Sequence, residues 1–475
     1  MINFSSLNEL REKIKEKNNS IATTREKWIN NNTYYYDRII TSLKFIIPDK
    51  SRILHIKCST GYILSHLNPE FGVGVDDSDK QIEIARNNYP GINFEIQDPE
   101  DIHINEKFEY IIISSLEDIV DIKSVLNILK NCSDRHTRII LINYNYLWNP
   151  LVKLAEYMRL KIPQKLHNWI SIEDVNNILK LSDYELILTK KLILFPLYFP
   201  LISSFLNKYV ARLPLFRNLT MMRISVARIK FKDDNDRSIS IIIPCKNEAG
   251  NIQAAVERIP QIGKHTEIIF CDDKSTDGTK EKIREMIEKY FDRDIKLVDG
   301  PGICKADNVW SGFDHASGDI LCILDADLTV LPEELPYFYE AISQDHGEFI
   351  NGSRLVYPMH EDAMRILNVI GNKFFSMLFS YILDTQIKDT LCGTKVFWRK
   401  DYEKIKRLRN SWGIKDRWGD YELIFGAAKN HLKIIDLPVH YVERTYGYTK
   451  MKNRLKNGLI MLKMSMVALR KIKFY

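Results

Sequence analysis

Two carboxylates one residue apart follow an apolar run in the second half of this 475-residue chain. The run is ILCIL, and the carboxylates are Asp325 and Asp327, with Ala326 between them. Two carboxylates this close at the end of a buried strand repel each other, and a cation beside them relieves the repulsion. Oxygen ligands suit Mg²⁺ or Mn²⁺, which also bind diphosphate groups. An Asp-x-Asp alone is a weak signal, but it predicts a divalent-metal site here.

Two other apolar runs also end in polar residues. SISIII and EIIF are followed, among others, by Pro244, Asn247, Glu248, Asp272 and Asp273. Ligands of open α/β sheets bind beyond the carboxyl ends of the strands, so these residues are candidates for the same site. Strand-to-helix loops use the same residue types for turns and caps, and for Asp277-Gly278 we prefer that interpretation.

The order of these stretches resembles the family 2 glycosyltransferases of GT-A fold, especially the branch that transfers sugars to polyprenyl phosphates. The matching stretches are IIIPCKNEAGNI, EIIFCDDKSTDGT, GDILCILDADLTVLPEEL, INGSRL, KDTLCGTKVFWRK and LPVHYVERTYGYTK, which span nearly all of residues 238–450. The resemblance implies a nucleotide-diphosphate sugar as donor. It assigns Pro244, Asn247 and Glu248 to the base and ribose pocket, Asp272 and Asp273 to the base side, Asp325 to ribose or metal, Asp327 to the metal, and Lys305 and Arg354 to the diphosphate.

The same resemblance indicates residues for the acceptor half of the reaction. Asp420, near the start of a predicted helix, is the candidate base that takes a proton from a hydroxyl acceptor, with Glu422 as its substitute. Two alternatives stay open: Asp420 could simply cap the helix, or the acceptor could be a lipid phosphate, which is already ionised and needs no base. Arg444, Thr449 and Lys450 lie where lipid-linked relatives hold phosphate.

The chain departs from the family pattern at three places. Thr329 stands where relatives often have a third metal-site side chain, and Cys304 replaces a usual glycine beside Lys305. Processive synthases carry Gln-x-x-Arg-Trp, and here Ile414 occupies the glutamine position. We therefore expect an inverting transfer of a single sugar to a lipid phosphate or a glycan.

The elements that must position these residues form two sets of short β-branched runs alternating with helical patterns, which predicts two α/β domains. The predicted strands are Arg52–Ile56, Gly72–Val75, Asn93–Ile96, Tyr110–Ser114 and Arg138–Asn143, then Ser240–Pro244, Glu267–Asp272, Ile295–Val298, Ile320–Leu324 and Phe349–Gly352. An apolar stretch with several prolines lies between the sets. We expect domains at residues 1–190 and 238–475, joined by a connector at 191–237.

The first domain resembles the class I S-adenosylmethionine-dependent methyltransferases, which implies a Rossmann-like fold. The matching stretches, ILHIKCSTGYILSHL, FGVGVDDSDKQIEIARNNYP and INFEIQDPEDI, lie within a resemblance that covers about residues 34–190. Gly61, Asp76 and Asp98 remain at cofactor positions of that family. His55 stands where an acid is usual, however, and Lys57 and Ser59 replace glycines of the cofactor loop.

The damaged loop leaves three interpretations of this domain: an active methyltransferase, a domain that binds the cofactor without turnover, and a structural remnant. Lys57 places a cation where a sulfonium cation would approach, so we favour loss of activity and doubt that S-adenosylmethionine binds. For the whole chain, the leading hypothesis is a metal-dependent glycosyltransferase with an inactive methyltransferase-like domain. The alternatives are a bifunctional enzyme with an active methyltransferase, a methyltransferase whose second half only binds, and a non-catalytic assembly protein.

Composition limits the partners and the location. The net charge of +6 is small beside 68 basic and 62 acidic residues, so nucleic acid is not an expected partner. Seven cysteines without a C-x-x-C pair indicate reduced thiols in the cytoplasm. The polar N-terminus does not read as a signal peptide, and no run of about 18 uncharged apolar residues occurs.

The C-terminal tail reads as a basic amphipathic helix from Asn453, with Leu455, Leu459, Leu462, Met466 and Leu469 on one stripe. We expect this stripe to pack on its own domain. The alternative is an interfacial helix on anionic lipid, which would place the protein at the cytosolic face of the inner membrane, near a polyprenyl-phosphate acceptor.

Overall fold

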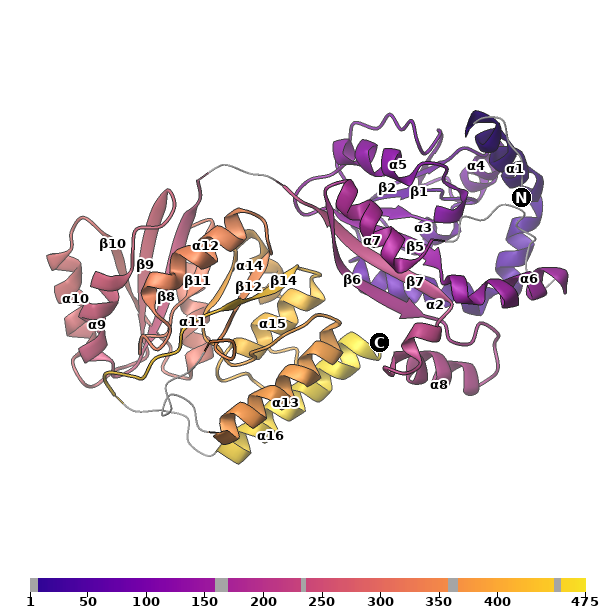
Figure 1. The fold of residues 1–475 in the computed structure, drawn as a ribbon. Helices are drawn as coiled ribbons and strands as arrows, with labels where there is room; N and C mark the ends of the chain where they lie inside the picture. The colour runs from indigo at the N-terminus through magenta and orange to yellow at the C-terminus, as the bar shows by residue number, and fades with distance from the viewer. Residues whose placement is uncertain (1–6, 159–169, 232–235, 358–365, 448–453) are drawn as a thin grey trace. The chain divides into compact units, whose positions relative to one another are not determined.

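The computed structural model describes residues 7–158, 170–231, 236–357, 366–447 and 454–475. The chain divides into two compact units, Met1–Lys230 with Phe474–Tyr475, and Phe231–Lys473. Each unit has its own sheet and its own apolar core (Figure 1). The prediction of two α/β domains is confirmed.

The N-terminal unit contains a seven-stranded sheet of order β3-β2-β1-β4-β5-β7-β6. Its strands are β1 Arg52–Ile56, β2 Phe71–Asp76, β3 Asn93–Ile96, β4 Tyr110–Ile113, β5 Arg138–Tyr144, β6 Tyr184–Leu192 and β7 Met222–Ile229. The first five are parallel, whereas β7 runs antiparallel to both β5 and β6. The order 3-2-1-4-5 is that of a doubly wound sheet, as expected for a Rossmann-like domain.

Helices cover this sheet because its central strands are apolar on both faces. In β4, for example, Ile111, Ile112 and Ile113 are all fully buried, the pattern of a parallel strand with a layer on each side. The helices are α1 Leu7–Asn31, α2 Thr33–Ile46, α3 Tyr62–His66, α4 Asp79–Asn88, α5 Ile122–Leu129, α6 Asn149–Tyr157, α7 Ile172–Leu181 and α8 Ile202–Lys208.

The connector expected at residues 191–237 is wrong as a separate segment. It contains α8 and β7, and β7 lies between β5 and β6, so this stretch belongs to the first sheet up to Lys230. Its prolines, which suggested a linker, lie in loops around α8 and not in a strand. The sequence of β7, MRISVARI, does not alternate cleanly because all eight of its residues are buried, the two arginines included.

The C-terminal unit contains a second seven-stranded sheet, of order β10-β9-β8-β11-β13-β12-β14. Its strands are β8 Ser238–Cys245, β9 His265–Asp272, β10 Asp294–Asp299, β11 Ile320–Ile323, β12 Phe349–Ser353, β13 Lys395–Trp398 and β14 Ile434–Pro438. Strands β8 to β11 are parallel, and β13 is antiparallel to both of its neighbours. The carboxyl ends of β9, β8 and β11 therefore meet at one edge.

The helices of this unit are α9 Ala249–Arg258, α10 Thr279–Lys289, α11 Lys305–His315, α12 Leu335–Ser343, α13 Ile366–Leu383, α14 Arg399–Lys406, α15 Asp420–Lys429 and α16 Arg454–Ala468. In the described parts of the chain, no helix has the length and apolar character needed to cross a membrane. Helix α16 contacts α13 and α15.

The predicted apolar stripe of the tail helix is partly wrong. Leu459 and Met466 are exposed, and the buried residues of the tail are Met461, Met464, Ser465, Ala468 and Ile472, with Lys473 beside them. This spacing of three, four and seven residues is that of one helical face, rotated from the predicted stripe. The small residues Ser465 and Ala468 were not counted as core, although they permit close packing of the helix.

Candidate functional site

The loops after β8 and β9 are tied together by Asn247. Its backbone lies in the left-handed region with φ 52°, and its N–H donates to Oγ of Ser275 at 2.9 Å. Its side-chain Oδ1 accepts from the N–H of Thr276 at 2.8 Å. Asn247 therefore shapes the wall of the predicted pocket, next to Pro244 at the end of β8.

Asp272, at the end of β9, has one oxygen without a partner. Its Oδ2 accepts from the N–H of Ser275 at 3.2 Å, whereas Oδ1 is buried and makes no hydrogen bond. An orphaned buried carboxylate oxygen is costly, so this position suits a donor group of a ligand. Asp273 is occupied: Oδ1 accepts from the N–H of Gly302 at 2.7 Å, and Oδ2 lies 3.2 Å from Nζ of Lys246.

Asp327 is bound on both oxygens. The hydroxyl of Thr329 donates to Oδ1 at 2.9 Å, and the guanidinium of Arg444 pairs with Oδ2. Another nitrogen of Arg444 lies 3.9 Å from the carboxylate of Glu248, which is buried at the start of α9. Arg444, predicted for the acceptor phosphate, thus lies against the predicted metal ligand.

Asp325 pairs with Lys305, the first residue of α11. Nζ of Lys305 lies 2.5 Å from Oδ1 of Asp325. Burial acts to raise the pKa of Asp325, but the positive charges of Lys305, Lys395 and Arg354 outweigh it and hold this pKa below its usual value. Burial opposes the charged form of Lys305 too, yet Asp325 and then Asp420 raise its pKa above the usual range. The site therefore holds Asp325 as a carboxylate.

Gly393 makes room for Asp325, since a Cβ on Gly393 would collide with the carboxylate. The sequence interpretation missed this residue. The only available signal was a glycine inside the matching stretch KDTLCGTKVFWRK, just before β13.

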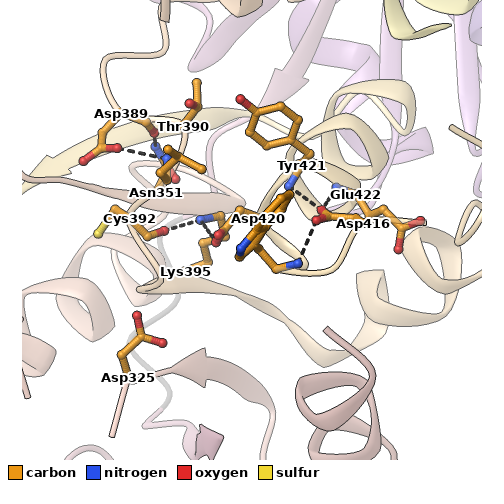
Figure 2. Close-up of polar contacts among 12 residues, drawn as sticks. Asp325, Asn351, Asp389, Thr390, Cys392, Lys395, Asp416, Asp420, Tyr421 and Glu422 are labelled. Atoms are coloured by element: carbon orange, nitrogen blue, oxygen red, sulfur yellow. Dashed lines mark hydrogen bonds and ion pairs between the residues drawn. The ribbon is translucent and has the colours of Figure 1, made fainter. Parts of the chain in front are cut away.

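Asp420 is paired with a buried lysine of β13 that the sequence interpretation also missed. Nζ of Lys395 donates to Oδ1 of Asp420 at 2.7 Å and to the carbonyl of Cys392, and both charged side chains are buried (Figure 2). The helix cap is provided elsewhere, because Asp416 accepts from the N–H groups of Tyr421 and Glu422. The capping interpretation of Asp420 therefore loses its main support.

Glu422 lies away from this pair, on another side of α15 (Figure 2). Its Oε1 accepts from the N–H of Asn410 at 2.8 Å, and burial raises its pKa to about 7. The structure does not bring Glu422 together with Asp420.

Arg354, after β12, makes a buried two-pronged pair with Asp389. Nε and Nη2 of Arg354 lie 2.7 and 3.0 Å from the two carboxylate oxygens. Burial opposes both charges, but the pair raises the pKa of Arg354 and lowers that of Asp389. The pair fixes the guanidinium of Arg354, whose charge is one of the smaller causes of the lowered pKa of Asp325. Thr449 and Lys450 lie outside the described residues.

The metal prediction rests on two carboxylates. Among the described residues, no group of three or more His, Cys, Asp or Glu side chains could hold a metal ion. Mg²⁺ commonly uses one or two carboxylates and completes its shell with water and phosphate oxygens, so Asp325 and Asp327 fit such an ion. Binding would require Arg444 to leave Oδ2 of Asp327.

In the N-terminal unit, the loop after β1 keeps the backbone of a glycine-rich loop. Lys57, Ser59 and Gly61 all have positive φ, of 57°, 55° and 80°. The Lys57 side chain is buried, and its Nζ lies 2.7 Å from Oδ1 of Asp77. Burial opposes its charge, but Asp76 and Asp77 raise the pKa of Lys57 above the usual value. A lysine cation therefore lies where glycine was expected.

Both predicted cofactor carboxylates accept hydrogen bonds from backbone N–H groups. Asp76 accepts from the backbone N–H groups of Ser59 and Ser78, and Asp98 accepts from that of Glu100. A cavity of about 320 Å³ lies at this edge, and its lining includes Lys57 and Ser59 but not Gly61, Asp76 or Asp98.

Helix α1 crosses the same edge. Its Arg11 pairs with Glu100 in the loop after β3, its Lys17 lies 2.8 Å from Asp118 in the loop after β4, and Asn19 accepts from Ser78 at the start of α4. Helix α1 and Lys57 therefore both lie at the edge where the sequence interpretation placed the cofactor, and Lys57 is paired there with Asp77.

Comparison with known proteins supports the interpretation of the C-terminal unit. Residues 240–420 match Glycosyl transferase family 2. The dolichol-phosphate mannosyltransferase of Pyrococcus furiosus is 38% identical over 220 residues, which are 46% of this chain and 60% of the relative. The undecaprenyl-phosphate 4-deoxy-4-formamido-L-arabinose transferase of Edwardsiella ictaluri is 31% identical over 220 residues, 45% of this chain and 62% of that protein. The chain thus spans about three fifths of the length of these relatives.

Solved structures similar to this chain include a Thermotoga maritima S-adenosylmethionine-dependent methyltransferase described as a possible histamine N-methyltransferase. It has a TM-score of 0.37 at 14% identity and covers 45% of this chain and 99% of its own. The magnesium protoporphyrin IX methyltransferase of Synechocystis PCC 6803 has a TM-score of 0.33 at 14% identity, with 46% and 99% covered. We therefore assign the Rossmann-like fold of the N-terminal unit from its own sheet order and not from these similarities.

Proposed function

We propose that the C-terminal unit, which contains a family 2 glycosyltransferase domain, transfers a single sugar from a nucleotide-diphosphate sugar to the phosphate of a polyprenyl lipid. The observation that carries this proposal is the meeting of Asp272, Asp325 and Asp327 at one sheet edge, with Lys305 and Arg444 bound to two of them. The names of the relatives support a lipid-phosphate acceptor.

On the donor side, the unpaired buried Oδ1 of Asp272 would accept a hydrogen bond from the base, and Asn247 would hold the loop that covers it. Asp325 and Asp327 would hold a divalent metal ion. When bound, such an ion neutralises the charge of the departing diphosphate. Lys305 and Arg444 would then exchange their carboxylate partners for phosphate oxygens, which long cationic side chains bind well.

On the acceptor side, the Asp420–Lys395 pair favours an acceptor that is ionised before it arrives. One carboxylate oxygen of Asp420 already accepts a hydrogen bond from the buried ammonium of Lys395, and a phosphate acceptor needs no base. The ionised phosphate oxygen would attack the anomeric carbon opposite the departing diphosphate, which inverts the configuration. Asp420 then acts by holding Lys395 in place.

The donor half is tested with a panel of nucleotide sugars and Mn²⁺, measuring sugar transfer to a short-chain polyprenyl phosphate. Asp327→Asn is expected to reduce turnover by about a hundredfold or more. Asp299→Asn, an exposed strand-end aspartate on β10, is the matched control and should keep full activity. No transfer by the wild type with any donor would refute the proposal.

The acceptor half is tested by comparing the polyprenyl phosphate with the polyprenol of the same length. Only the phosphate should accept sugar, because the alcohol requires a base. Comparable rates with both acceptors would return Asp420 to the role of general base.

A further inference from the structure

Large apolar side chains are exposed on two short segments of the N-terminal unit. Sixteen of the thirty exposed large apolar residues in the described part of the chain lie within residues 146–158 and 197–219. They are Tyr146, Leu147, Leu151, Leu154, Tyr157, Met158, Leu197, Tyr198, Phe199, Leu201, Ile202, Phe205, Tyr209, Leu213, Leu215 and Leu219. A concentration of this kind on a folded surface marks a site of interaction.

The two segments are joined into one surface. The indole N–H of Trp148, just before α6, donates to the carbonyl of Leu219 at 2.7 Å, and the Asn145 amide donates to that of Asn218 at 2.9 Å. Leu151 of α6 and Leu197 before α8 also line the same cavity. We call residues 146–158 with 197–219 the apolar platform; α6 and α8 are labelled in Figure 1.

Helix α8 is inverted, with polar residues inside and apolar residues outside. The amide of Asn207 is buried and bonds the N–H of Leu194 at 2.7 Å and the Tyr34 hydroxyl at 2.9 Å. The hydroxyl of buried Ser203 accepts from the N–H of Phe199 and donates to the carbonyl of Leu197, both in the segment before α8. Ile202 and Phe205 are 58% and 59% exposed. The hydrogen bonds hold the apolar face outward, so its exposure is built into the fold.

The charge of this region selects the partner. The two segments of the apolar platform contain four basic residues, Lys153, Lys208, Arg212 and Arg217, and one acidic residue, Glu156; of the basic residues, Arg212 is buried. Exposed aliphatic and aromatic side chains with an excess of basic over acidic residues are the composition of segments that lie in the headgroup region of anionic membranes. A protein partner with an apolar patch would not require this excess of basic residues.

We propose that the apolar platform docks the N-terminal unit on the surface of an anionic lipid bilayer. Phe199, Ile202, Phe205 and Leu215 enter the boundary between headgroups and acyl chains, while Lys208 faces the lipid phosphates. The role assigned to this unit is therefore to bind the membrane. The inference does not depend on the transferase activity, because vesicle binding is measured without donor or acceptor.

The experiment measures binding of the full chain to vesicles of phosphatidylcholine with or without 30% phosphatidylglycerol. The test variant is Ile202→Ser with Phe205→Ser, whose side chains are exposed, so folding should survive. We expect the partition coefficient to fall about tenfold for each side chain removed. Lys208→Glu should weaken binding to the anionic vesicles only. Phe291→Ser, which is 89% exposed in the C-terminal unit, is the matched control and should bind like the wild type.

Several results would overturn the proposal. One is a wild type that binds neither vesicle, and another is a serine variant that binds as well as the wild type. Loss of binding in Leu459→Ser, an exposed position of α16, with the platform variant unaffected, would move the membrane contact to the tail helix. A wild type that self-associates without lipid, and a serine variant that stays monomeric, would make the platform a protein interface. If the double variant unfolds, Phe205→Ser alone is measured by the same criteria.

Discussion

Single residues of the candidate site are arranged as pairs of opposite charge. Asp325 is bound by Lys305, Asp327 by Arg444, Asp420 by Lys395 and Asp389 by Arg354. Two of these pairs, at Asp325 and Asp327, involve the predicted metal ligands. A metal ion and a diphosphate together would replace the two pairs without a change in the balance of charge, because the ion takes the carboxylates and the diphosphate takes the cations.

This arrangement predicts that Arg444 competes with the metal. Arg444→Met should strengthen binding of Mn²⁺ alone about fivefold to tenfold, because Asp327 no longer has to exchange a cation for the ion. The same variant should lower sugar transfer, since the proposed phosphate partner is lost. Mn²⁺ titration by electron paramagnetic resonance measures the first effect. The control is Arg409→Met, because wild-type Arg409 pairs with Asp307 of α11 and not with a predicted metal ligand. Weaker Mn²⁺ binding by Arg444→Met would contradict the competition.

Glu422 gives a prediction with a defined pH range. Its pKa in the folded protein, about 7, lies above the value of about 4.3 in an unfolded chain, so folding favours the protonated form. The contribution of protonated Glu422 to the free energy of unfolding is fully present below about pH 4 and is lost as the pH rises through 7. Glu422→Gln should therefore be about 2 kcal/mol more stable than the wild type at pH 8 and equal to it near pH 4.

Urea unfolding at the two pH values measures this difference. Glu288→Gln, an exposed position of α10, should change neither value. An equal effect of Glu422→Gln at both pH values would show that ionisation of this carboxyl is not the cause. If Glu422→Gln also keeps full sugar transfer, Glu422 is excluded as the catalytic base.

The sequence was informative for residues that directly follow an apolar strand. Asp272, Asp325 and Asp327 were found in this way, and the structure places them at adjacent strand ends. Lys395, Asp416 and Gly393 were not found, because their roles depend on contacts between β13, α15 and β11 that no local pattern records. For Lys395, the available signal was a lysine in an apolar strand, since a buried lysine needs a partner.

At the scale of elements, each predicted strand is present, with bounds that differ by at most two residues. The four missed strands, β6, β7, β13 and β14, are those outside the regular parallel alternation. In β7 the guanidinium of Arg228 is fully buried and pairs with Glu185 of β6 at 2.9 Å. Because that pair forms only when the antiparallel neighbour is in place, the polar residues of β7 concealed the strand.

The loop between β1 and α3 gives a prediction about the binding of S-adenosylmethionine. The wild type should show no calorimetric binding of S-adenosylmethionine at 1 mM ligand, about the weak limit of specific ligands. Lys57→Gly with Ser59→Gly keeps the left-handed backbone and removes the cation, so binding should become measurable. Micromolar binding by the wild type would refute the view that Lys57 excludes the cofactor. Binding by neither protein would assign the exclusion to α1.

At the scale of the whole molecule, two separate cores predict two unfolding events. The larger apolar cluster around β8, β9 and β11 lies entirely in the C-terminal unit, and the cluster around β1, β4 and β7 lies entirely in the N-terminal unit. A ligand stabilises only the unit that binds it. Calorimetry of the full chain should therefore resolve two transitions that respond to different ligands.

A nucleoside diphosphate with Mn²⁺ should raise only one of these transitions. At a hundred times its Kd the ligand adds about 2.7 kcal/mol, which corresponds to roughly 5–10 °C for a unit of this size. Asp327→Asn should abolish that rise, because the metal holds the diphosphate. Anionic vesicles should move the other transition, and Ile202→Ser with Phe205→Ser should remove that response. If one transition moves with both ligands, the units unfold together, and the division of donor binding and membrane binding between them has to be abandoned.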